Sequence, residues 1–195
     1  MKLLGLASVF LTITLALSAP HKRQTESPEY VLQLINTIRE AHGVKTLVWN
    51  TELEKAALTK AERCLEKIPN PNGVLSLFAR GTGSWKEAIT KLYSIGLSQY
   101  DYDNPKLHIT NSIFMIFMGP KHKSVGCAAA NCNSTSIRQC LFDSEGAYQN
   151  LEEFINDIKA NVHPANATLA IDSVAPKSML ANFVSPQSYS ADISF

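Results

Sequence analysis

The sequence predicts an α+β domain in a secreted protein. Four segments carry apolar residues at the spacing of a helix, and two short runs ahead of the last of them suit strands. A short apolar N-terminus suits a targeting segment, and the rest of the 195-residue chain is long enough for one domain with one sizeable core.

The first predicted helix begins at Ser27, which suits the N-cap, with Pro28 in the first turn and Gly43 at the end. Its apolar stripe is Val31, Leu34, Ile35 and Ile38. A second helix is expected to begin after Asn50 or Thr51. One face of it holds Leu53, Ala56, Ala57, Lys60 and Cys64, so we expect Cys64 to point inward.

A cluster of turn residues at 69–73 separates the second helix from a third, which Ser84 opens and 100–105 ends. The apolar face of the third helix is Trp85, Ala88, Ile89, Leu92 and Tyr93. The six apolar residues Ile113–Met118 are too few to span a membrane and suit a buried core element. No other segment after the N-terminus is long and apolar enough to span one.

Two β-compatible runs, 124–130 and 136–142, are separated by 131–133 and predict an antiparallel pair. A last helix is expected over 151–162, with the apolar stripe Leu151, Phe154, Ile155 and Ile158. The tail after Pro164 receives no assignment.

The N-terminus has the three parts of a signal peptide. Lys2 gives a basic start, residues 3–17 are almost wholly apolar, and small residues precede a cleavage site after Ser18. A membrane anchor is the alternative, but the apolar run is shorter than the roughly 20 residues that a spanning helix needs. We therefore expect cleavage of 1–18 and a secreted, extracellular protein. The segment 19–29 follows, and its Lys22-Arg23 pair is either a dibasic processing site or a solvated charge cluster.

The charge balance argues against nucleic-acid binding. The chain has 18 Lys and Arg against 17 Asp and Glu, and removal of 1–18 takes away Lys2 alone. A protein without net positive charge lacks the electrostatic footprint that phosphate recognition requires.

Four cysteines remain after cleavage, at positions 64, 127, 132 and 140. An even number in a secreted chain predicts two disulfides, for which the sequence alone allows three pairings. A zinc site is the competing interpretation, but no pair has CxxC spacing. Asn133 and Asn166 each begin an Asn-x-Thr glycosylation motif, so we expect both to be exposed.

Four blocks of the sequence, together with 100–105, resemble the CAP superfamily, which comprises the cysteine-rich secretory, antigen 5 and pathogenesis-related proteins. In order, the blocks are Asn36-Thr37-Ile38-Arg39 with His42-Gly43-Val44, Leu47, Trp49 and Asn50; Leu53, Ala56, Ala57, Ala61 and Cys64; Val125-Gly126-Cys127 with Cys132; and Cys140-Leu141-Phe142 with Gly146 and Asn150. The last block departs from the family signature, since Phe142 replaces a tyrosine and Ser144 a proline. The resemblance covers a CAP-like domain over about 30–150, and leaves 151–195 as a C-terminal helix and tail of unknown role.

The resemblance implies a three-layer α/β/α sandwich with a short antiparallel sheet between helical layers. It also implies the disulfides Cys64–Cys132 and Cys127–Cys140. Many CAP domains hold a divalent cation in a central cleft with two histidines and two acidic residues, which are ligand types that such cations accept.

The chain departs from the family at all four of these cleft positions. One histidine falls on Ile113, one acidic residue falls near Ser76, and the other falls on Ile95 or Gly96. The remaining histidine belongs at about 65–69, where none occurs. We therefore expect no metal ligands, no catalytic residues and no cofactor.

The sequence also lacks the G-x-S-x-G, HExxH and phosphate-loop motifs of common enzyme classes. The preferred hypothesis is a non-catalytic binding module for a lipid, a sterol or a protein partner. The alternative is a secreted metal-dependent hydrolase that takes its ligands from outside the family motif, such as His108, His122 and Glu66.

Overall fold

The computed structural model describes residues 26–64, 70, 73–144, 148–165 and 189–192. These residues form, in chain order, α1 (Pro28–Ala41), β1 (Val48–Trp49), α2 (Thr51–Glu62), β2 (Val74–Gly81), α3 (Trp85–Ser98), α4 (Ser112–Met118), β3 (Ser124–Cys132), β4 (Thr135–Asp143), α5 (Leu151–Asn161) and β5 (Tyr189–Asp192). The predicted signal peptide 1–18, the Lys22-Arg23 pair, Glu66 and Asn166 lie outside the described residues. Within the part described, no helix is long and apolar enough to cross a membrane.

Polar side chains cap four of the helices, and the predicted N-cap Ser27 and the predicted helix start at Ser84 are confirmed. The Ser27 hydroxyl accepts the Tyr30 N–H at 3.3 Å at the start of α1, and the Asn50 side chain accepts two N–H groups at the start of α2. Ser84 and Glu87 form a reciprocal capping box at α3. Asn150 caps α5 by accepting the Glu153 N–H at 2.9 Å. Each cap satisfies main-chain donors that have no partner within the helix.

The sheet is larger than the predicted strand pair. Its strand order is β1-β3-β4-β2-β5, and all neighbouring strands are antiparallel except β1, which pairs in parallel with β3. The predicted pair is confirmed as β3 and β4, with Cys127 opposite Cys140 in the register. The sequence predicts no strand at β1, β2 or β5, because β1 and β5 are very short and β2 lacks alternation of polar and apolar residues.

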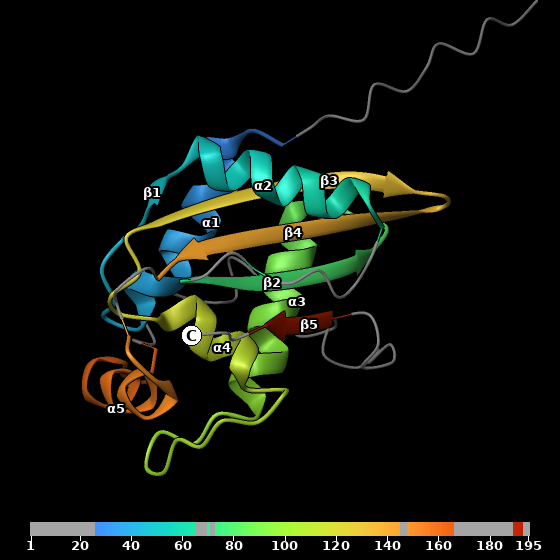
Figure 1. The fold of residues 1–195 in the computed structure, drawn as a ribbon. Coiled ribbons are helices and arrows are strands. Elements are labelled where there is room, and N and C mark those ends of the chain that lie inside the picture. Colours follow the sequence, from blue (N-terminus) through green and yellow to red (C-terminus); the bar gives the residue numbers. More distant parts are fainter. Residues whose placement is uncertain (1–25, 65–69, 71–72, 145–147, 166–188, 193–195) are drawn as a thin grey trace, which may run out of the picture.

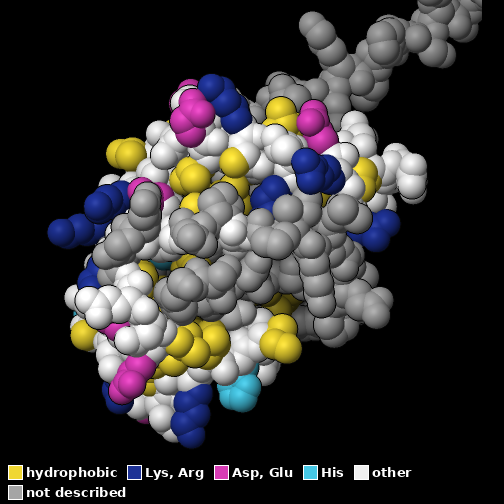
Figure 2. All heavy atoms as spheres, viewed as in Figure 1, with side chains coloured by type: hydrophobic (Ala, Val, Ile, Leu, Met, Phe, Trp, Pro, Cys, Tyr) yellow, Lys and Arg dark blue, Asp and Glu magenta, His cyan; other side chains and the backbone are white. Residues whose placement is uncertain are grey.

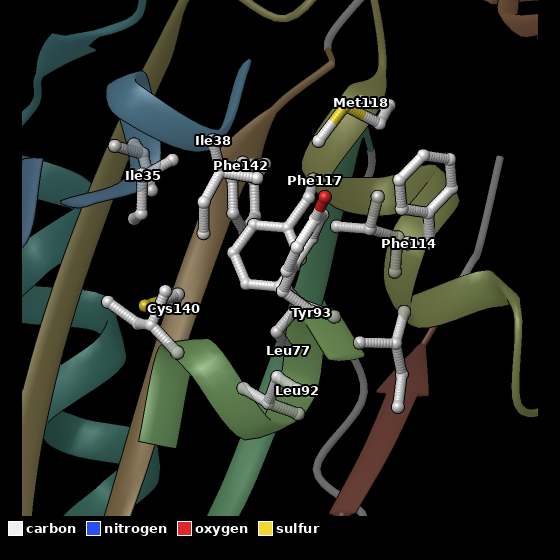
Figure 3. Close-up of a cluster of buried hydrophobic side chains, with 14 of the residues drawn as sticks. Ile35, Ile38, Leu77, Leu92, Tyr93, Phe114, Phe117, Met118, Cys140 and Phe142 are labelled. Carbon is white, nitrogen blue, oxygen red and sulfur yellow. The ribbon is translucent and has the colours of Figure 1, made fainter. Parts of the chain in front are cut away.

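Helices cover both faces of the sheet, which confirms the predicted three-layer α+β sandwich (Figure 1). Alternating side chains of β2 point to opposite faces. Leu75 and Leu77 belong to the main core, which α1, α3, α4 and α5 share. Val74 and Phe78 belong to two smaller clusters beneath α2. Figure 3 shows the main core, in which side chains from α1, α3 and α4 meet those of β2 and β4.

The C-terminal helix is part of this same core. Phe154 and Ile158 of α5 are fully buried with the residues of the other helices. Beyond it, β5 pairs with β2 from Ser76 to Ala79. The described part of 151–195 therefore completes the domain rather than forming a separate unit.

The two disulfides join Cys64 to Cys132 and Cys127 to Cys140, which is the pairing that the resemblance implies. The first bridge ties the end of α2 to the sheet, and the second crosslinks β3 and β4. The expectation that Cys64 points inward is wrong. Because α2 ends at Glu62 and Cys64 adopts φ +55°, the cysteine is exposed and reaches back to the buried Cys132.

Candidate functional site

The candidate site is the region where the CAP resemblance places a cation-binding cleft. Ile113, at the first turn of α4, is 3% exposed and belongs to the main core. The β2 residues that face the same core are Leu75, Leu77 and Ala79, whereas Ser76 has the alternate orientation, toward α2. The side chains facing this core from α4 and β2 at these positions are thus apolar, and they offer a cation no donor atoms.

Close packing of two helices excludes a ligand at the third cleft position. A Cβ built on Gly96 of α3 would lie 2.4 Å from the main-chain nitrogen of Phe114 in α4. No side chain fits there unless the helices separate. The neighbouring Ile95 is half-buried and packs against the main core. Figure 3 shows Tyr93 of α3 beside Phe114 and Phe117 of α4 in this packed layer.

A buried arginine fixes the C-terminal end of α4. Arg39 of α1 is fully buried, and its guanidinium donates to the Phe117 carbonyl at 2.6 Å and to the Gly119 carbonyl at 3.3 Å. Its Nε donates to the Lys45 carbonyl at 2.8 Å. The last carbonyls of a helix accept no hydrogen bond from within that helix, so the carbonyls of Phe117 and Gly119 need an outside donor. The negative end of the helix dipole also favours a cation there. Burial lowers the pKa of Arg39 to about 10, so the side chain stays charged at neutral pH.

The ligands named for the alternative metal site do not share an environment. His108 is exposed on the loop before α4, whereas His122 is 3% exposed in the core, and Glu66 lies outside the described residues. Among the residues described, no three His, Cys, Asp or Glu side chains are grouped so that they could hold a metal ion.

The buried His122 side chain is surrounded by aromatic rings, and its two ring nitrogens lack good hydrogen bonds. Its ring lies 5.8 to 6.3 Å from those of Phe142, Tyr148 and Phe154. Neither ring nitrogen has a partner with full hydrogen-bond geometry among the described atoms. Burial, followed by the charge of Arg39, lowers the pKa of His122 to about 3, although the main chain of Ile116 and Asp143 opposes the shift.

His42 is a second buried histidine, and its hydrogen bonds are complete. Its Nδ1–H donates to the His163 carbonyl at 2.6 Å, and its Nε2 lies 2.7 Å from the Tyr93 hydroxyl. Because the carbonyl can only accept, Nδ1 carries the proton and Nε2 accepts from Tyr93. Burial lowers the pKa of His42 against the opposing hydrogen bond to His163, and burial raises that of Tyr93 to about 12. This network holds the segment after α5 against the end of α1, so both groups have structural roles.

The loop before α4 presents one apolar side chain to solvent. Ile109 is 86% exposed, the largest exposure among the large apolar residues described. The buried Asn111 accepts the His108 N–H at 2.8 Å and donates to the Lys106 carbonyl at 2.6 Å. The Ser112 hydroxyl donates to the carbonyl of Ile109 itself at 2.7 Å. Three hydrogen bonds therefore constrain the backbone on both sides of Ile109.

Sequence reasoning missed Arg39, Asn111 and Ile109 as determinants of this region. Arg39 was part of a matched block but received no role, since a charge in the last turn of a helix is usually solvated. Asn111 and Ser112, adjacent polar residues before an apolar run, were the available signal for a structured turn. Nothing in the sequence marks Ile109 as exposed.

The chain is similar to a known protein family in sequence and to solved structures in fold. The sequence profile of the cysteine-rich secretory protein (CAP) family matches residues 32–142, which is more than half of the chain. A search among curated proteins finds no match.

Solved structures of several proteins have similar folds. Venom allergen-like protein 4 from Schistosoma mansoni is 12% identical, with a TM-score of 0.54, and the match covers 77% of this chain and 96% of that one. The hookworm platelet inhibitor is 20% identical, with a TM-score of 0.52, and the match covers 79% and 86% of the two chains. At these identities the likeness is one of fold.

Proposed function

Because the chain belongs to the cysteine-rich secretory protein family, whose members are mostly extracellular, we propose that it is a secreted, non-catalytic module that binds a protein partner. The observation that carries the non-catalytic part is the packing at the cleft positions. Ile113 is buried in the core, and Gly96 contacts Phe114 so closely that no ligand-bearing side chain fits. A cation stripped of water must regain its coordination from protein atoms, and apolar side chains supply none.

The complete burial of α4 favours a protein partner over a lipid or sterol. All seven residues of α4 are buried, so they serve the packed core and are not free to line a pocket. Ile109, by contrast, is exposed on a backbone that three hydrogen bonds hold. Transferring an isoleucine side chain from water into an apolar pocket contributes about 1.5–3 kcal/mol, or roughly tenfold to hundredfold in affinity. A fixed loop also loses little conformational freedom on binding.

The charge distribution fits a protein surface rather than a polyanion. On the face shown in Figure 2, Lys and Arg side chains are interspersed with Asp and Glu. Close to Ile109 in the sequence, Lys106 and His108 are also exposed. We expect the partner to offer an apolar pocket with carboxylates at its rim.

The test uses protein recovered from its native secretion. Partners that copurify with the wild type are identified by mass spectrometry, and each is then purified and titrated against wild type, Ile109→Asp and the control Ile109→Val. We expect at least tenfold weaker binding for Ile109→Asp and near-wild-type binding for Ile109→Val. A stoichiometric lipid in the native protein, with no partner whose affinity depends on Ile109, would contradict the proposal. N-terminal sequencing of the same material should start near residue 19 or at 24, and an intact Met1 would contradict secretion.

A further inference from the structure

The hairpin tip between β3 and β4 joins a glycosylation motif to the exposed end of a disulfide. The turn has two residues, Asn133 and Ser134, and both are exposed. Figure 1 shows this tip extending beyond α2, on the side of the molecule away from α5. Asn133 adopts φ +57°, a left-handed conformation that Asn and Asp tolerate better than other residues with a side chain.

The Asn133 side chain has no hydrogen bond to any of the described atoms, whereas the third residue of the motif has structural partners. The Thr135 hydroxyl donates to the Cys132 carbonyl at 3.1 Å and accepts from Arg80 Nε at 3.4 Å. The fold therefore accounts for Thr135 and for the turn, but it gives the Asn133 amide no structural role.

The residue before the motif is half of a disulfide. Cys132 is buried, but its partner Cys64 is exposed, and their Cα atoms are 5.7 Å apart. Since adjacent Cα atoms are 3.8 Å apart, the Cα of Asn133 lies at most about 9.5 Å from that of Cys64. An oligosaccharide of several rings extends farther than this distance. The exposed end of the bridge is consequently within reach of a glycan on Asn133.

We propose that Asn133 carries an N-linked glycan and that this glycan shields the Cys64–Cys132 disulfide from protein-sized reductants. The proposal rests on the extracellular routing proposed above. In the reaction, the Asn133 amide nitrogen attacks the anomeric carbon of a lipid-pyrophosphate-linked oligosaccharide. The new C–N bond replaces the C–O bond to the pyrophosphate, which leaves, and the amide nitrogen loses one proton.

The first experiment tests occupancy in a secretory eukaryotic host. All variants carry Asn166→Asp, so that Asn133 is the single remaining acceptor. We expect a gel shift on treatment with peptide-N-glycosidase for the parent and for Thr135→Ser, and none for Asn133→Asp. Protein that reaches the medium without a glycan at Asn133 would overturn this proposal while leaving secretion intact. Protein that stays in the cell with Met1 in place would instead overturn the proposed function.

The second experiment tests shielding with a built-in control. Enzymatic release of the glycan converts Asn133 to aspartate, so the treated parent and Asn133→Asp have the same polypeptide sequence. Reduction by thioredoxin is followed by alkylation and peptide mapping of both bridges. We expect several-fold slower reduction of Cys64–Cys132 in the glycosylated protein than in either aspartate form. The bridge Cys127–Cys140, whose cysteines are both buried, should react alike in all three. Equal rates at Cys64–Cys132 would overturn the shielding role.

Discussion

Mild acid should destabilise the folded protein through His122. Its ring is 3% exposed, and its pKa falls from about 6.5 in the unfolded chain to about 3 in the fold. The folded state therefore binds the proton less tightly than the unfolded state does. The stability contributed by neutral His122 is fully present above pH 6.5 and is lost as the pH falls from there toward 3.

The size of the effect follows from the two pKa values. Relative to pH 8, linkage gives a loss of about 2 kcal/mol at pH 5 and about 3 kcal/mol at pH 4. Ordinary carboxylates titrate near 4, so histidines dominate between pH 7 and pH 5. The buried His42, whose pKa is also lowered, contributes with the same sign.

The assay is urea denaturation at pH 8, 7, 6 and 5 for the wild type and His122→Leu. The wild type should lose at least 2 kcal/mol over this range, and the variant should lose clearly less, with the remainder due to His42. The comparison uses the pH slope, so it holds even if the variant is less stable at every pH. A wild type that is flat between pH 7 and pH 5, or a variant with the wild-type slope, would refute the assignment.

Three further outcomes follow from the packing around α3 and α4. Gly96→Ala should lower the free energy of unfolding by about 2 kcal/mol in urea denaturation, because the new Cβ overlaps Phe114. Alanine has the better helix propensity, so a more stable variant would contradict this contact. Tyr93→Phe should cost about 1–3 kcal/mol by the same measurement, since it leaves the buried Nε2 of His42 without a donor, and an unchanged midpoint would contradict the bond. Zinc should leave the Tm unchanged relative to a chelator control, whereas a saturable rise would restore the metal-dependent alternative.

Four of the five described helices were predictable from their apolar periodicity, and three of these also have a capping residue that marks the start; α4, which has no side-chain cap, was predicted only as a buried element. Ser27, Asn50 and Ser84 are polar residues placed directly before periodic apolar segments, and all three cap helices. The strand β2 gave no such signal. Both of its faces are covered by helices, so Val74–Ala79 lacks the alternation of polar and apolar residues that marks a half-buried strand.

The candidate site was only partly predictable, because its determinants act over long sequence separations. That Ile113, and no histidine, stands at a cleft position could be predicted by carrying the family's motif positions over to this sequence. The partners of Arg39 could not, since the carbonyls of Phe117 and Gly119 lie 78 and 80 residues away. The exposure of Cys64 was mispredicted because the helical pattern continued for two residues beyond the end of α2.

The two ends of α4 are fixed by different interactions, and both bear on the proposal that this chain binds a partner at its surface. At the C-terminal end, the buried guanidinium of Arg39 donates hydrogen bonds to the carbonyls of Phe117 and Gly119. Near the N-terminal end, the contact between Gly96 and Phe114 packs α3 against α4. Such packing leaves α4 little freedom to open over an internal ligand. In the loop before α4, the side chains of Asn111 and Ser112 hydrogen-bond the main chain of Lys106, His108 and Ile109. The packing around α4 thus accompanies both features on which the proposed function rests, which are buried apolar side chains at the cleft positions and a hydrogen-bonded loop that presents Ile109.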